Sequence, residues 1–419
     1  YWQIADTLYG RDFLVTTTLL KGSACQTRYS EQRYGYGGDR LDVCIFRLKK
    51  RGDDILMLQP FMQDIVHGNS GGVSDIVKQK GEGAVVECLK VVARDEYEAL
   101  VDITDLLEKN ESYFGLGRFE MDLGIGTYVP ESSFLKEVCP AAKSLTIRFV
   151  RTCMSVSPFP DPSVKSEPTR WEYGVSLCLL DKIPMEGRMI DGRVGYFTNK
   201  VRNYDNAVYD KGECEFISRW KLVPHREQLE AYLGGDLVEP IKPIVFYIDK
   251  QIPTWLYPYV KRAVEAWQPA FERAGFKNAI LARPEPMREE DSVFSVDNAR
   301  YAYISYKTSP LKNAYGPSSV DPRSGEILCS HIGIFNSISD LVQELYFCQA
   351  GAVDSLARRI VLPDTLLGKL IQYVVCHEVG HALGLKHNFR GSSVFSTASL
   401  RDKEFLRNNG HGASIMDYM

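Results

Sequence analysis

Three histidines and one glutamate lie within eleven residues of the sequence, in the stretch VVCHEVGHALGLKHNF (Val374–Phe389). His377 and His381 are four residues apart in an apolar run, LLGKLIQYVVCHEVGHAL, whose pattern predicts a helix. Four residues are about one helical turn, so both imidazoles lie on one face and can bind the same metal ion. Glu378 follows the first histidine directly, so its carboxylate lies beside such an ion rather than pointing at it.

A glycine and a third histidine complete this pattern. Gly384 comes three residues after His381, where a glycine can take the left-handed conformation that ends a helix and turns the chain back. The turn brings His387 round as a third ligand. Three imidazole nitrogens with an open fourth position are typical of catalytic zinc, whereas structural zinc sites are closed and richer in cysteine. Chance produces the full pattern in on the order of one chain of this composition in a hundred thousand, so the sequence predicts a zinc site.

Other residues are weaker candidates for metal ligands. Cys376 borders His377, but one residue along a helix is a rotation of about 100°, so a buried thiol is favoured over a ligand. The ten cysteines are scattered singly; disulfides stay open, although mostly buried free thiols are favoured. The remaining histidines lack partners at ligand spacing and are interpreted as structural or surface residues, namely His67, His225, His331 and His411.

Length and composition bound the fold and argue against some functions. At 419 residues, the chain exceeds the usual size of a single hydrophobic core, so two domains are expected. A formal net charge of −4 and short Lys/Arg runs give no reason to expect nucleic-acid binding. No apolar stretch approaches the roughly 20 residues that span a bilayer. The chain starts at YWQIADTLYG and stops at SIMDYM, so we expect both ends to be cuts in a longer product, with a removed signal peptide left open.

Residues 1–233 are predicted to form a β-rich domain. Strand-like runs of β-branched and aromatic residues recur in RDFLVTTTLL, LDVCIFRLKKRGDDILMLQP, YEALVDITDLL, KSLTIRFV and YGVSLCLL. The RGDD sequence at Arg51 predicts a hairpin turn. Loops are predicted for GNSGGVSD from Gly68 and for SVSPFPDPSVKSEP from Ser155. No catalytic constellation is visible in these residues, so the sequence predicts no role for this domain.

A linker-like segment, GGDLVEPIKP (residues 234–243), precedes a different pattern. PIVFYID predicts a strand, and TWLYPYVKRAVEAWQPAFERAG predicts a helix that Pro269 kinks or breaks and Gly275 ends. Strands are predicted for NAILAR and RYAYISYK, and a hairpin for SSVDPRSGEILCSHIGIF. A helical region from Ile338 and a second helix that runs into the histidines follow. Residues 244–419 are therefore expected to form a small α/β layer domain.

The string from His377 to His387 resembles the zinc signature of the metzincin metallopeptidases. These enzymes also have a tight turn with a methionine beneath the zinc, and SIMDY (Ser414–Tyr418) resembles that Met-turn. RVGYF (Arg193–Phe197), KPIVFYID, AGFKNAI, DPRSGEIL and HEVGHALGLKHNF are similar to a group of large secreted bacterial zinc metallopeptidases. In that group a β-rich domain of uncharacterised function precedes the catalytic part.

The resemblance implies an α+β fold class, in which a β-rich N-terminal domain precedes a metzincin-like α/β catalytic domain with a twisted sheet and a zinc-binding helix, truncated at the Met-turn. It also implies a zinc-dependent endopeptidase. His377, His381 and His387 would hold Zn²⁺. Glu378 would act as general base toward a zinc-activated water, and Tyr418 would stabilise the oxyanion.

Further expectations concern the surroundings of the zinc. Met416 would be a packing base beneath the ligands, since a thioether binds zinc poorly compared with imidazole. In metzincins an extended substrate pairs with an exposed strand, and the hairpin strand Gly325–Phe335 is the candidate for that pairing, with an ordinary inner strand as the alternative. Asn388 after the third histidine and an extra helical segment, roughly residues 338–362, depart from better-known metzincins, so no subfamily specificity follows.

Two other functions stay open. The chain could be a zinc-bearing binding protein, latent or inert as an enzyme, whose β-rich half is the functional module; the intact Glu378 argues against this. A zinc amidase that acts on non-peptide bonds would use the same water chemistry. The expected partner is a protein or peptide substrate. A location outside the cytoplasm (secreted, periplasmic or at the cell surface) follows from the resemblance alone, and neither the substrate nor the oligomeric state is predicted.

Overall fold

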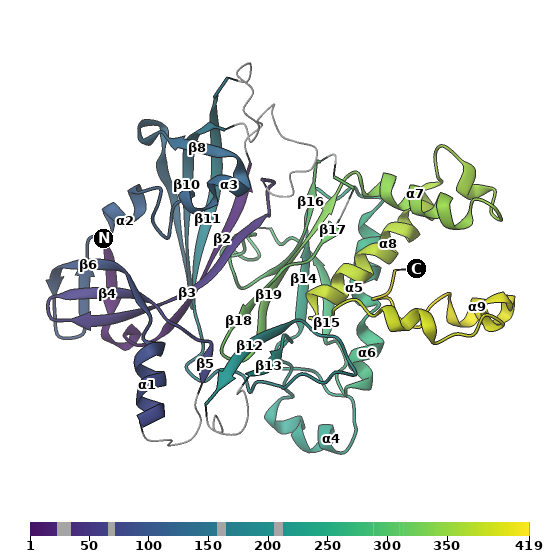
Figure 1. The fold of residues 1–419 in the computed structure, drawn as a ribbon, viewed down its shortest axis with the longest axis horizontal. Helices are drawn as coiled ribbons and strands as arrows, with labels where there is room; N and C mark the ends of the chain where they lie inside the picture. Colours follow the sequence, from purple (N-terminus) through teal and green to yellow (C-terminus); the bar gives the residue numbers. More distant parts are fainter. Residues whose placement is uncertain are drawn as a thin grey trace.

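The computed structural model describes residues 1–22, 35–65, 72–156, 165–204, 213–287, 289–309, 311–312 and 314–418. Figure 1 shows a β-rich N-terminal half on the left and a C-terminal half with the longer helices on the right. The fold class is α+β, as the sequence predicts. Within the described residues, no helix is both long and apolar enough to cross a membrane.

A large antiparallel sheet dominates the N-terminal half. Its strands lie in the spatial order β1 (Trp2–Ala5), β7 (Glu98–Val101), β6 (Ala84–Arg94), β4 (Asp54–Gln59), β3 (Arg40–Arg51), β2 (Asp12–Lys21), β11 (Pro168–Leu179), β10 (Ser144–Ser155) and β8 (Ile125–Tyr128), with β9 (Phe134–Ala141) also paired to β10. Short helices accompany it, namely α1 (Gly72–Gly81), α2 (Thr104–Glu108) and α3 (Glu120–Leu123). The predicted hairpin turn joins β3 to β4, with Gly52 in the left-handed region at φ 56°.

Two sequence predictions for this half need correction. In YEALVDITDLL only residues 98–101 form a strand, and helix α2 follows. The reason is local, because the Asp102 carboxylate accepts the N–H of Thr104 over 2.9 Å and starts a helical turn. The loop predicted from Gly68 lies outside the described residues up to residue 71, and from Gly72 the chain is helical. The loop predicted from Ser155 lies mostly outside the described residues.

A second sheet forms the C-terminal half. Its strands lie in the order β15 (Ile280–Pro284), β14 (Ile244–Ile248), β16 (Ala302–Lys307), β19 (Glu326–Phe335) and β17 (Ala314–Tyr315), with β18 (Ser318–Asp321) also paired to β19. β15, β14, β16 and β19 are parallel, whereas β17 and β18 run antiparallel to β19. The helices are α5 (Tyr257–Glu265), α6 (Gln268–Arg273), α7 (Ile338–Ala350), α8 (Asp364–Ala382) and α9 (Lys403–Asn409). As predicted, the helix before the second strand breaks next to Pro269, between α5 and α6.

The strand suggested for substrate pairing is an inner one. β19, which covers nearly all of Gly325–Phe335, pairs with β16 on one side and with β17 and β18 on the other. Within the described residues β16 pairs with the second half of β19, residues 331–335, so β19 is an inner strand there, which was the alternative expectation. The expectation that it is the exposed strand that pairs with substrate is wrong. Within the described residues, β17 and β18 form the edge of the sheet. The chain reverses its direction between β16 and β17, so β17 and β18 lie along the outer side of β19. The sequence pattern of a simple hairpin does not reveal this reversal.

A third, smaller sheet joins β13 (Glu213–Ile217), β12 (Thr198–Asn203) and β5 (Asp64–Ile65), and the short helix α4 (Leu229–Leu233) follows. The predicted linker, residues 234–243, lies between α4 and β14, and a domain boundary there stays a prediction.

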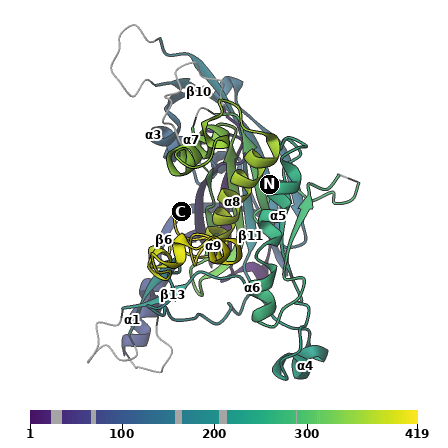
Figure 2. The same ribbon diagram turned by 90° about the vertical axis from the view of Figure 1, so that its right-hand side faces the viewer.

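The N-terminal sheet packs on the face of the C-terminal sheet that is opposite to the helices. Ile332 belongs to the apolar core beneath α5 and α8, and its neighbour His331 points the other way, with Nδ1 3.0 Å from the carbonyl oxygen of Gly38. Lys307 on β16 faces the same side and forms a fully buried ion pair with Asp39. The view in Figure 2 brings the C-terminal helices to the front. The N-terminal half therefore backs the sheet and leaves the helical face to the histidines.

Candidate metal centre

Helix α8 (Asp364–Ala382) carries the first two histidines, as predicted. The ring centroids of His377 and His381 lie 4.7 Å apart, one helical turn along the same face. Gly380, between them, lies against the methionine of the predicted Met-turn: an added Cβ would come within 2.2 Å of Sδ of Met416. A side chain at this position would therefore have to displace Met416 and also Trp267, whose Cζ2 would lie 2.8 Å from the added Cβ.

The helix ends at Ala382, and Gly384 turns the chain with φ 102°. An added Cβ at Gly384 would also lie 2.1 Å from the carbonyl oxygen of Ser218, so both conformation and space require glycine. Beyond the turn, His387 comes back to the helix, and its Nε2 lies 3.1 Å from Nε2 of His381. One ligand atom from each of the three histidines can be chosen so that all lie within 4.8 Å of one another.

Backbone carbonyl groups set the tautomers of two of these rings. Nδ1 of His377 lies 2.7 Å from the carbonyl oxygen of Ile415, and Nδ1 of His381 lies 2.7 Å from that of Leu385. A carbonyl oxygen can only accept, so each Nδ1 carries the proton and each Nε2 keeps its lone pair. Metal-binding histidines typically donate their second N–H to a carbonyl group in this way.

Burial lowers the pKa of both His377 and His381 below the usual histidine value. Low pKa values keep the imidazoles neutral near pH 7, which is the form that binds a metal ion. The lone pair of His381 Nε2 also faces the third ring at hydrogen-bond distance. The three imidazoles thus fit a zinc ion in donor type, and His377 and His381 fit it also in tautomer and charge.

The Met-turn lies under this cluster and is tied to the chain after the third histidine. Met416 is buried with 3% exposure, and its carbonyl oxygen accepts the N–H of Asn388 over 2.7 Å. The next residue, Asp417, accepts hydrogen bonds from the N–H (2.6 Å) and the hydroxyl (2.5 Å) of Ser392. The Ser392 hydroxyl holds the pKa of Asp417 below the usual range, so this anchor is an ionised carboxylate.

Glu378 lies beside a cavity of about 600 Å³ that the first of the three histidines also lines. The wall includes His377, Glu378 and Tyr418, and apolar side chains of α7 and α8, among them Leu341, Leu345, Leu370, Tyr373 and Val374. Helix α7, the segment that departs from better-known metzincins, thus forms one side of this cavity. A site that opens into a cavity has room for a substrate beside the metal.

Tyr418 and Cys376 have contrasting places next to the cluster. The ring of Tyr418 is 68% exposed, and its centroid lies 4.5 Å from that of His387 and 5.7 Å from that of His377. Burial raises the pKa of the Cys376 thiol to about 11, and among the described residues the cluster of possible ligand atoms comprises the three histidines without this thiol.

The residues interpreted as lying outside the site stay outside it. His331 is buried at the junction of the two halves, and His225 and His411 are exposed; His67 lies outside the described residues. All cysteines in the described part of the chain are unpaired. Only Cys153 and Cys329 among them are fully buried, so the expectation of mostly buried thiols is wrong.

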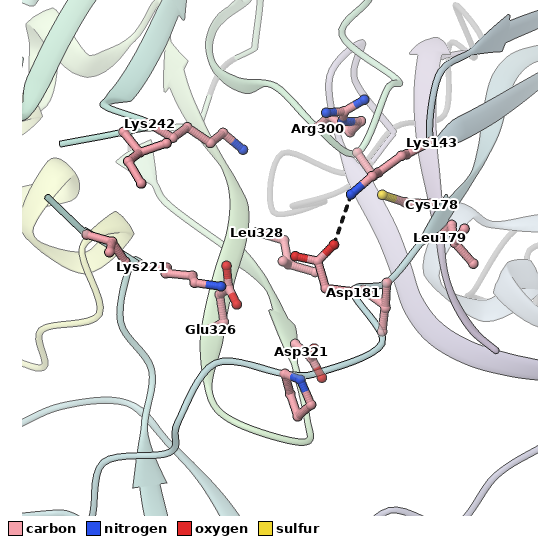
Figure 3. Close-up of a pocket in the computed structure, with 15 residues that line it drawn as sticks. Lys143, Cys178, Leu179, Asp181, Lys221, Lys242, Arg300, Asp321, Glu326 and Leu328 are labelled. Atoms are coloured by element: carbon pink, nitrogen blue, oxygen red, sulfur yellow. Dashed lines mark hydrogen bonds and ion pairs between the residues drawn. The ribbon is translucent and has the colours of Figure 1, made fainter. Parts of the chain in front are cut away.

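A second cavity, of about 450 Å³, lies between the two halves of the chain (Figure 3). There Nζ of Lys143 lies 3.0 Å from a carboxylate oxygen of Asp181. Charges of both signs line the rest of the wall, namely Lys221, Lys242, Arg300, Asp321 and Glu326. Because these charges nearly balance, the wall gives no clear preference for the charge of a ligand.

Sequence reasoning missed several contacts that build the metal centre. These are the carbonyl groups of Ile415 and Leu385, the Asp417 anchor, and the N-terminal segment Arg193–Phe197, which pairs with the chain beside the third histidine. The only signal for that segment in the sequence was the resemblance of RVGYF to the metallopeptidase group. That resemblance did not predict that the segment lies beside the third histidine.

Comparison with known proteins gives two matches to family models. Residues 359–419 match a family described as Met-zincin. Residues 38–225 match a family described as a domain of unknown function (DUF5117). No curated protein and no solved structure matches the chain. The first match spans α8, the three histidines and the Met-turn, so the C-terminal part of the chain is a metzincin-like region with a histidine triad suited to a metal ion.

Proposed function

We propose that this chain is a zinc-dependent endopeptidase. The observation that carries the proposal is the pair of hydrogen bonds from Nδ1 of His377 and His381 to backbone carbonyl groups, because they leave bare Nε2 atoms near His387. Glu378 follows the first ligand at the wall of a cavity. A three-histidine centre next to an open cavity is typical of catalytic zinc.

Each residue of the centre has a proposed role. A zinc ion bound by the three imidazoles would supply Lewis acidity, which activates water and polarises a carbonyl group. The Glu378 carboxylate would accept a proton from the attacking water and deliver it to the nitrogen of the leaving amine. The Tyr418 hydroxyl would donate a hydrogen bond to the developing oxyanion. Its exposed ring next to His387 supports this role.

The edge of the sheet suggests how a peptide would lie. Strands β17 and β18 border the centre: an added Cβ at Gly316, between them, would lie 3.1 Å from the carbonyl oxygen of Glu378. An extended peptide can add to such an edge as a further strand. The apolar cavity beside it would receive a side chain of the peptide. We therefore propose protein or peptide segments in extended form as the substrate.

The alternative, a latent or inert binding protein, has less support. Among the described residues, the wall of the cavity comes from residues 312–418 alone, so the N-terminal half does not cover it. A zinc amidase would use the same catalytic residues, and a panel of peptide and non-peptide substrates separates the two. Action outside the cytoplasm remains a proposal that rests on the resemblance of the sequence.

The test is cleavage of an unfolded protein by the zinc-loaded chain, beside the variants Glu378→Ala and His225→Ala. We expect wild type and His225→Ala to cleave, and Glu378→Ala to retain zinc but lose turnover. Turnover by Glu378→Ala would show that the general base is another group. Silence from all three with one zinc bound would favour the binding function.

A further inference from the structure

A strand from the N-terminal half holds the short arm that carries the third histidine. Residues Gly384–His387 are called the ligand arm here, and residues Gly195–Phe197 the clasp strand. The N–H of Phe197 donates to the carbonyl oxygen of Gly384 over 2.8 Å. The N–H of Lys386 donates to the carbonyl oxygen of Gly195 over 3.0 Å. The two segments therefore pair as antiparallel strands.

The register of this pairing aims one carbonyl group at a metal ligand. Tyr196 and Leu385 lie opposite each other between the two hydrogen bonds. In such a pair the N–H and C=O of the central residue point away from the partner strand. The C=O of Leu385 accordingly accepts Nδ1–H of His381 over 2.7 Å, and its N–H donates to Gly380 over 3.0 Å. The clasp strand thus fixes the carbonyl group that orients His381.

Nearby residues of the N-terminal half close the end of α8. The indole N–H of Trp220 donates to the carbonyl oxygen of Ala382 over 2.9 Å, at a helix end where carbonyl groups lack intrahelical partners. The N–H of Ser218 donates to the carbonyl oxygen of Phe197 over 2.7 Å, and the carbonyl oxygen of Ser218 lies against Gly384. The turn, the helix end and the ligand arm are therefore all held by residues that precede the predicted linker.

We propose that the clasp strand, together with Trp220, is a positioning element of the metal centre, through which the N-terminal half raises the affinity of the protein for its metal ion. Groups that orient metal ligands typically change metal affinity about 10–100-fold. The inference rests on the part of the proposed function in which the histidine triad binds a metal, and it is independent of proteolysis. It assigns to the N-terminal half a role that the sequence alone did not suggest.

The clearest test compares two variants of the full-length chain at one position. Phe197→Pro removes the N–H that bonds to the ligand arm, whereas Phe197→Ala keeps it and removes the ring that lies beside His381. Zinc affinity is measured by competition with a chelator, and ligand geometry by the visible absorption spectrum of the cobalt-loaded protein. Relative to Phe197→Ala, which loses the ring alone, we expect Phe197→Pro to lose about tenfold or more in zinc affinity and to change the cobalt spectrum.

Equal zinc affinities and equal cobalt spectra in the two variants would overturn the inference. Trp220→Phe offers a second variant, because it removes the N–H donated to Ala382 and keeps an aromatic ring in the core. We expect a smaller loss of zinc affinity in this variant, since the clasp strand remains.

A measurement on the unaltered protein keeps the inference testable if Phe197→Pro does not fold. Coupling is reciprocal, so zinc must stabilise the strand pairing by as much as the pairing favours zinc. We expect added zinc to slow hydrogen exchange at the amide of Phe197 and to leave that of Val175, in the distant strand β11, unchanged. Exchange at Phe197 that is equal with and without bound zinc would contradict the inference.

The outcomes separate this inference from the proposed function. If zinc affinity depends on the clasp strand but the chain cleaves nothing, the inference stands and the endopeptidase proposal fails. If Glu378-dependent cleavage occurs and Phe197→Pro binds zinc like Phe197→Ala, the reverse holds.

Discussion

Nδ1 of His377 lies 2.7 Å from the carbonyl oxygen of Ile415, the residue before the methionine of the Met-turn. The Met-turn therefore does more than pack beneath the metal ligands, since its backbone orients one of them. It also fills the space left by Gly380 with the thioether of Met416. The positions of helix α8 and of the Met-turn are thus linked by a hydrogen bond and a close contact.

Substitution of the turn glycine should damage both stability and metal binding. Gly384→Ala places a side chain at φ 102° and within 2.1 Å of the carbonyl oxygen of Ser218. We expect a loss of about 1–3 kcal/mol in the free energy of unfolding, from the backbone strain alone, and weaker zinc binding because the ligand arm shifts. Gly192→Ala is the matched control, because an added Cβ there meets nothing within 4 Å. Urea unfolding and zinc titration of both variants check this prediction.

The buried ion pair between the halves should be essential for their packing. The side chains of Lys307 and Asp39 are 1% and 0% exposed, so Lys307→Met leaves a carboxylate buried without its counter-charge. We expect a loss of about 3–5 kcal/mol in the free energy of unfolding. Lys49→Met, which breaks the exposed pair with Glu82, should lose less than about 1 kcal/mol. A similar small loss in both variants would mean that the buried pair contributes little to stability.

Stability should fall on acidification because of one histidine at this junction. Burial, together with the positive charges of Arg40 and Lys307, lowers the pKa of His331 well below its usual value. Below about pH 6.5 the unfolded chain binds a proton at this residue that the folded chain does not, so the free energy of unfolding decreases as pH falls.

The expected slope from this residue approaches about 1.4 kcal/mol per pH unit well below pH 6.5. Urea unfolding of metal-free protein between pH 7.5 and pH 5 measures it, with His331→Asn as the comparison. His377 and His381 also have lowered pKa values and contribute to both slopes, so the difference between the two proteins is the quantity of interest. Parallel slopes would show that His331 takes up its proton in the folded state.

The cavity beside Glu378 should select a large apolar side chain of the substrate. Leu345 on α7 lines this cavity although it is 47% exposed. Leu345→Asp should lower kcat/KM for peptides that place a large apolar residue there, by about 10–200-fold. Phe347→Asp is the control, since Phe347 is an exposed residue of the same helix that does not line the cavity. If both substitutions lower kcat/KM equally, or if neither lowers it, α7 does not form part of the substrate site.

Separation of the two halves by cleavage at the predicted linker would also remove groups that hold the metal centre. Cleavage at the predicted linker near Gly234 leaves Gly195–Phe197 and Trp220 on the N-terminal piece. Loss of activity after the pieces part would then reflect loss of the clasp strand and not an inert catalytic region. Zinc affinity of the isolated C-terminal piece equal to that of the intact chain would contradict the further inference.

Much of the metal centre follows from local sequence. The helix period puts His377 and His381 on one face, and Gly384 can turn the chain so that His387 returns. These features depend on neighbours within about ten residues. The strands of the N-terminal half and the break next to Pro269 were predictable for the same reason, because alternation, turn residues and proline act locally.

Tertiary structure alone decided which distant groups meet the histidines. The carbonyl group of Ile415 and the clasp strand Gly195–Phe197 reach the ligands through backbone hydrogen bonds, which any residue type can form and which leave no mark in a single sequence. Alternation along β19 was equally silent about its inner position, since a strand pattern records which face is buried and not which edges are paired. The sequence by itself thus determined the candidate ligands and their spacing, because these depend on local helix and turn geometry, whereas the folded chain determined which distant groups orient them and which cavity lies beside them.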